Sequence, residues 1–137
     1  MLLRGDLTAL ALLLGAACGA CALDSQAMQQ KKAEFQRTIP TCEATIDCNA
    51  KWEAAQLWII HHAGFKLQTV TDVILETYNP GPYDALDAVR VTKEPIGGGR
   101  YALVVYVWCN NIFSCVPNTW DAAIDFNRTI NGVQVSR

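Results

Sequence analysis

Alternating apolar and polar positions in the second half of the chain predict a β-hairpin. One strand is expected over residues 86–93 and the next over residues 100–109, joined by a glycine-rich turn over residues 95–99. In the later strand both alternating sets are apolar, which is typical of a strand that is buried on both faces. We therefore expect an inner strand, with Tyr106 and Trp108 either in the core or lining a ligand cleft.

Helical spacing predicts two helices on either side of these strands. The first covers residues 47–63, with Asp47 as its N-cap and Gly64 after its end, and it is apolar around much of its circumference. Either a second layer of the protein or a binding partner is expected to cover the additional apolar side. The second helix covers residues 120–130, with Thr119 as its N-cap.

The remaining segments are predicted from composition. Residues 65–78 are rich in Thr, Val, Ile and Leu and predict one long strand, which a turn with two prolines ends. Residues 23–41 are predicted to form a polar tether or a short helix, and residues 133–135 a short edge strand. Consecutive strands flanked by helices predict an α+β domain over residues 42–137: an antiparallel β-sheet of three or four strands with two helices packed on it, stapled by two disulfides.

The beginning of the chain has the layout of an export signal. Arg4 precedes an apolar run over residues 7–17, and small residues around Cys21 precede a polar segment. The run is shorter than the roughly 20 residues that span a bilayer. We expect residues 1–22 to be a signal that is cleaved after Ala22 or lipidated at Cys21. The protein is thus expected to be exported, and to reach a membrane only through a lipid anchor at Cys21.

Four further cysteines form two identical C-x5-C spacings. In an oxidising compartment we favour the local pairs Cys42 with Cys48 and Cys109 with Cys115, although four cysteines allow three connectivities. Each local loop contributes about 2 kcal/mol on the chain-entropy estimate. The rival interpretation is a four-cysteine zinc site, but structural zinc prefers closer cysteine spacings. No metal and no cofactor are predicted.

Titratable residues form no convincing catalytic group. The adjacent side chains of His61 and His62 diverge on a helix, with no carboxylate or cysteine one turn away. Asp121 and Asp125 share a helix face on which Arg128 is available as a local ion-pair partner for Asp125. The net charge is −2 and the sequence has no basic face, so no nucleic-acid partner is expected. No catalytic residue is predicted, and an enzyme is the least favoured class.

Two loops are candidate recognition surfaces. Ile112 and Phe113 lie between Cys109 and Cys115, where a closed ring would present them on a constrained tip unless they fold back into the core. Tyr83 lies on a proline-stiffened turn. Such residues suit a non-catalytic module that binds another envelope or secreted protein, which is the favoured function.

A carrier of small molecules or lipids is the alternative function. Its ligand would lie in an apolar cleft between helix and sheet. The expected lining is aromatic and comprises Trp52, Trp58, Tyr106 and Trp108.

Overall fold

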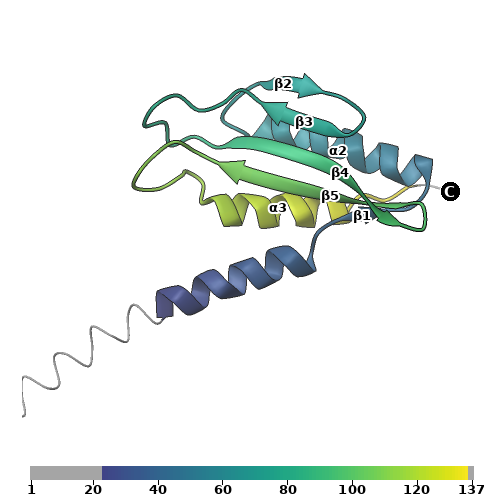
Figure 1. Ribbon diagram of the computed structural model, residues 1–137, viewed down its shortest axis with the longest axis horizontal. Coiled ribbons are helices and arrows are strands. Elements are labelled where there is room, and N and C mark those ends of the chain that lie inside the picture. Colours follow the sequence, from purple (N-terminus) through teal and green to yellow (C-terminus); the bar gives the residue numbers. More distant parts are fainter. Residues whose placement is uncertain (1–22, 136–137) are drawn as a thin grey trace, which may run out of the picture.

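The computed structural model describes residues 23–135, which form a five-stranded antiparallel sheet and three helices (Figure 1). The α+β class is therefore confirmed, with more strands than predicted. A third helix forms where a polar tether or a short helix was predicted. The predicted signal, including Cys21, lies outside the described residues. The first helix covers residues 23–37. The other elements are, in chain order, β1 (Thr41–Cys42), α2 (Thr45–His62), β2 (Leu67–Val70), β3 (Ile74–Thr77), β4 (Ala88–Gly97), β5 (Arg100–Trp108) and α3 (Thr119–Asn131).

The sheet has the strand order β1-β5-β4-β3-β2, and its centre is the predicted hairpin of β4 and β5. Val91 pairs with Val105 in the middle of this hairpin. Gly97, Gly98 and Gly99 form its end with φ angles of 90°, 63° and 72°. Residues other than glycine rarely adopt positive φ angles, which explains the run of three glycines.

One face of the sheet packs against the helices and the other is open. Leu103, Val105 and Val107 of β5 are buried, whereas Tyr106 between them is 61% exposed. The prediction that this strand is buried on both faces is wrong, and neither Tyr106 nor Trp108 belongs to the core. Alternation reveals which residues share a face, but coverage of that face depends on other segments, and α2 and α3 pack on one side only.

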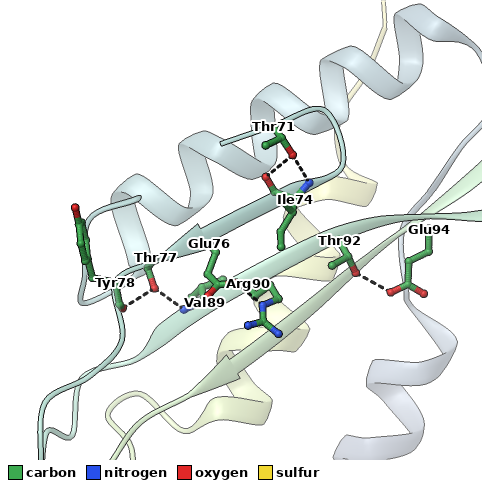
Figure 2. A network of polar contacts seen from close by, with 9 residues as sticks. All are labelled: Thr71, Ile74, Glu76, Thr77, Tyr78, Val89, Arg90, Thr92 and Glu94. Atoms are coloured by element: carbon green, nitrogen blue, oxygen red, sulfur yellow. Dashed lines mark hydrogen bonds and ion pairs between the residues drawn. The ribbon is translucent and has the colours of Figure 1, made fainter. Parts of the chain in front are cut away.

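The predicted long strand over residues 65–78 is in fact the hairpin of β2 and β3. Its turn depends on Thr71, whose hydroxyl accepts hydrogen bonds from the backbone N–H groups of Val73 (3.3 Å) and Ile74 (3.0 Å). Trp52 of α2 donates its indole N–H to the carbonyl of Thr71 (3.0 Å) and so ties the turn to the helix layer. Figure 2 shows the turn beside the polar residues of the open sheet face. A threonine turn without glycine or proline leaves the strand-like composition unbroken, which explains the incorrect prediction.

β1 occupies the sheet edge beside β5. Thr41 pairs with Ala102, and the backbone N–H of Leu103 donates to the carbonyl of Pro40 (2.8 Å). Past Leu103 no strand pairs with this side of β5 within the described residues, so the predicted inner strand is inner only at its beginning. No strand forms over residues 133–135, contrary to the prediction, and β1 holds the edge instead.

The helix boundaries agree with the sequence to within about two residues, but the caps differ. α2 begins after Ala44, and Asp47 stabilises this end from the first turn, where its carboxylate accepts the backbone N–H of Glu43 (3.2 Å). α3 is capped by Asn118, whose side chain accepts the N–H of Trp120 (3.1 Å). Gly64 follows α2 for a tertiary reason: a Cβ at this position would lie 2.5 Å from the Cβ of Leu86.

The helix over residues 23–37 is docked on α3 and is not a free tether. Phe35 is buried and contacts the ring of Trp120 edge to face, with 5.7 Å between ring centroids. Asn127, fully buried in α3, donates its side-chain N–H to the carbonyl of Phe35 (3.0 Å) and to the hydroxyl of Thr38 (3.2 Å). Lys31 forms an ion pair with Asp121 at 2.7 Å. These contacts dock residues 31–38 on α3, and Phe35 joins the hydrophobic core.

Both predicted disulfides are confirmed. Cys42 pairs with Cys48, and Cys109 pairs with Cys115. The first disulfide is buried next to the start of α2, and the second, half-buried, closes the loop after β5. Each closes a short ring, so each stiffens a loop more than it links the two halves of the domain.

The one-sided sheet leads to a stability prediction. Phe126 of α3 is fully buried and contacts Trp58 edge to face, so Phe126→Ala should lower the free energy of unfolding by about 3–5 kcal/mol. Tyr106→Ala on the open face removes a stacking contact with Trp108 and no core packing, and it should cost about 0.5–1.5 kcal/mol. Urea unfolding of the two variants measures both values. Equal losses would contradict the assignment of Tyr106 to an open face.

Candidate functional site

Two loops meet at one end of the sheet. β3 and β5 both pair antiparallel with β4 and therefore run in the same direction (Figure 1). The segments that follow Thr77 and Trp108 therefore leave the sheet at the same end of the strands. The first segment is the turn that contains Tyr83, and the second is the ring closed by Cys109 and Cys115. The topology thus brings the two predicted recognition loops together.

Hydrogen bonds tie these loops to each other. The backbone N–H of Asn110 donates to the carbonyl of Asp84 (3.0 Å), and the side-chain N–H of Asn111 donates to the carbonyl of Tyr83 (2.9 Å). On the far side of the ring, Val116 donates its backbone N–H to the carbonyl of Ala85 (2.8 Å). The two loops therefore form one connected structure.

Asn111 also directs the apolar residues of the ring outward. Its side-chain oxygen accepts the backbone N–H groups of Phe113 (2.9 Å) and Ser114 (3.3 Å), which forms a tight local turn. Phe113 is 88% exposed and Ile112 is 78% exposed. The alternative in which these side chains fold back into the core is therefore excluded by the structure.

Tyr83 is presented in an unusual backbone conformation. Its φ is 63°, in the left-handed region that residues other than glycine rarely occupy. Holding a tyrosine there costs on the order of 1 kcal/mol or more. The hydrogen bond from Asn111 to its carbonyl helps to hold this conformation. Tyr83 is 75% exposed, so the strained turn places an aromatic side chain in solvent.

We call this surface the apolar tip. Its members are exposed apolar side chains on the two tied loops. They are Tyr83, Leu86, Ile112, Phe113 and Val116. Leu86 and Val116 were not predicted; they are joined by a β-bridge, and that tertiary pairing has no signal in the sequence.

The four predicted cleft residues do not come together. Trp52 and Trp58 are buried under the sheet in the helix layer, where the indole N–H of Trp58 donates to Asp125 (2.8 Å). Tyr106 and Trp108 stack on each other on the opposite, open face, with centroids 5.3 Å apart. Because the sheet lies between the two pairs, the expected carrier cleft is not formed by these residues.

The open sheet face carries a polar network around the aromatic pair. Arg90 of β4 forms an ion pair with Glu76 of β3 (Figure 2). Its guanidinium lies 5.9 Å from the centroid of the Trp108 ring. The ion pair with Glu76 raises the pKa of Arg90 further. Thr92 donates its hydroxyl to Glu94 (2.7 Å) on the same face. These polar groups satisfy one another, as expected of a solvated surface.

The other titratable candidates have structural contacts. His62 stacks on Trp58, with 4.9 Å between ring centroids, and His61 is exposed to solvent. Asp125 does not pair with Arg128, contrary to the sequence-based interpretation, because it accepts the indole N–H of Trp58 and Arg128 pairs with Glu34 of the first helix. The helix over residues 23–37, which was not expected to dock there, changes these partners.

Sequence reasoning missed Asp87, which lies directly beneath the apolar tip. The residue is only 2% exposed, and neither of its carboxylate oxygens has a hydrogen-bond partner in the described part of the chain. Burial raises the pKa of Asp87 to about 6. A carboxylate oxygen of Asp87 and the Sγ atoms of Cys109 and Cys115 all lie within 4.8 Å of one another. A single acidic residue at the start of a strand is common on surfaces, so the sequence contains no signal for this burial.

The buried carboxyl group generates a pH prediction. Because its pKa is higher in the folded state than the usual value of 3.8, this group favours folding at low pH, and its contribution is lost as the pH rises through about 6. The isosteric variant Asp87→Asn cannot ionise. Its stability relative to the wild type should therefore increase from pH 4 to pH 7, as measured by denaturant midpoints at each pH. A constant difference over this range would mean that Asp87 is solvated.

Comparison with other proteins adds no functional assignment. No protein-family model matches the chain, and searches of curated proteins and of solved structures find no match. Any function is therefore inferred from the apolar tip, the open sheet face and the environment of Asp87.

Proposed function

We propose that this protein is an exported, non-catalytic module that binds another envelope or secreted protein through the apolar tip. The observation that supports the proposal most directly is the rigid exposure of Phe113 and Ile112 on a loop closed by a disulfide and tied to a second loop. Apolar side chains at this level of exposure cost solubility unless they are covered at least part of the time. A binding partner provides that cover.

The physical advantage of such a surface is low entropic cost. Flexible loops lose conformational freedom when they dock, whereas the ring between Cys109 and Cys115 is already closed and braced by Asn111. Aromatic residues also contribute a disproportionate share of binding energy at protein interfaces. Phe113 and Tyr83 are therefore the expected anchors of the interaction.

Export is supported by the disulfides and by the opening of the sequence. The two disulfides point to an oxidising, extracellular environment. None of the helices within residues 23–135 is long and apolar enough to cross a bilayer. Cleavage after Ala22 and lipidation at Cys21 both remain proposals for how the chain is released or anchored.

The proposed interface predicts selective loss of binding. The full chain would be used as bait on an extract of cell-surface and secreted proteins from its own source, and binding of a captured partner would be measured with purified components. Phe113→Ala and Ile112→Ala should each weaken this binding at least about tenfold with little change in thermal stability, because both side chains are exposed.

Ile46 provides the matched control. It is an isoleucine that is 69% exposed in the first turn of α2, within the ring that Cys42 and Cys48 close. Ile46→Ala should leave partner binding unchanged. Equal binding by the wild type and all three variants would show that the apolar tip is not the interface.

A further inference from the structure

The disulfide of Cys109 and Cys115 differs from its counterpart in ways that bear on reactivity. Cys42 and Cys48 are buried, whereas Cys109 and Cys115 are both half-exposed at the loop end of the sheet. A thiolate must reach a sulfur in line with the S–S bond, so exposure decides which bond is open to exchange. The two disulfides have equal ring sizes, which makes them a natural comparison within one molecule.

The second difference is the carboxyl group beside the exposed bond. A carboxylate oxygen of Asp87 lies within 4.8 Å of the Sγ atoms of Cys109 and Cys115. No other three His, Cys, Asp or Glu side chains within residues 23–135 bring their ring nitrogens, sulfurs or carboxylate oxygens this close together. Both oxygens of Asp87 are buried without a hydrogen-bond partner. An unpartnered buried carboxyl group is costly for a fold and is typical of groups retained for chemistry.

We propose that Cys109, Cys115 and Asp87 form a thiol–disulfide exchange site that reacts with dithiols, with Asp87 transferring the proton to and from the leaving sulfur. The proposal is independent of the binding function described above. Cys109 and Cys115 are the reacting groups, and Asp87 is the proton donor in the reducing direction and the proton acceptor in the oxidising direction.

The electrons and protons of the reaction balance with a dithiol as the co-reactant. One thiolate of the dithiol attacks a sulfur of the Cys109–Cys115 bond, which forms a mixed disulfide and breaks the protein S–S bond. The bonding electrons move to the other sulfur, which takes the proton of Asp87 as it leaves. The second thiol of the dithiol then attacks the mixed disulfide and displaces the first cysteine, whose sulfur takes the proton that this thiol loses. The dithiol ends as a cyclic disulfide, the protein gains two thiols, and solvent reprotonates Asp87.

The surroundings of Asp87 permit this role. The neighbouring segments contain several titratable side chains, namely His61, His62, Lys66, Tyr78, Tyr83 and Asp84. None of these contributes to the shift of the Asp87 pKa to about 6, which burial alone causes. The carboxyl group can therefore exchange its proton near neutral pH without an ion-pair partner that would hold it charged.

The test measures how fast dithiothreitol reduces each disulfide in the full chain between pH 5 and pH 8. Rates are divided by the thiolate fraction of the reagent, and the two bonds are distinguished by alkylation and peptide mapping. For Cys109–Cys115, the corrected rate in the wild type should be high below about pH 6 and should fall at least fivefold above it, as Asp87 loses its proton. The buried Cys42–Cys48 bond should react at least tenfold more slowly, with no such step.

Asp87→Asn separates proton transfer from simple charge repulsion. If Asp87 donates the proton, the variant should show a flat profile at least about tenfold below the low-pH rate of the wild type. If the ionised carboxylate merely repels the attacking thiolate, the variant should be flat at the low-pH rate of the wild type, which would overturn the proposal. A wild-type profile without the pH step, together with equal reactivity of the two disulfides, would overturn the proposal as well.

Asp84→Asn is a control for general changes in charge near the ring, because Asp84 lies on the adjacent loop and contacts Asn110 through its backbone. This variant should retain the pH step of the wild type. Circular dichroism of each variant confirms that the domain is folded before rates are compared.

Discussion

The packing of α2 and α3 on a single face of the antiparallel sheet is the constraint on which the rest of this structure depends. It decides which alternate residues of β4 and β5 are core, with Val91 and Val105 buried and Tyr106 exposed. Because of the antiparallel order, β3 and β5 also end at the same end of the sheet. The loops that follow them are neighbours for this reason, so the apolar tip depends on the sheet topology as much as on the loops themselves.

Local features of the fold were predictable from the sequence because local residues determine them. The hairpin of β4 and β5 follows from alternation and from Gly97–Gly99, and matched short spacings favoured, among three connectivities, the two disulfide pairs that form. The hairpin of β2 and β3 was missed because its turn is built by a threonine hydroxyl and not by glycine or proline. Strand β1, with two residues, is too short for a periodic pattern to reveal.

The site was predicted only in part for the same physical reason. Ile112, Phe113 and Tyr83 were singled out by loop chemistry, and the structure places them on tied, exposed loops. Their meeting depends on strand direction, and the burial of Asp87 depends on how Gly64 and the ring pack around it; neither has a signature in the sequence. The misplaced cleft arose similarly, since hydrophobic periodicity cannot tell which face of a sheet another element covers.

The docked first helix has a consequence for the orientation of the whole molecule. Lys31 contacts Asp121 near the start of α3, and Thr38 contacts Asn131 at its end, so the two helices run in parallel. α3 itself starts shortly after the ring that bears Phe113, and the first helix therefore begins toward the end of the molecule from which the apolar tip projects (Figure 1). If the chain is tethered to a surface by the residues before this helix, the tip is held on the tethered side. A partner would then meet it close to that surface, and not from the open medium beyond.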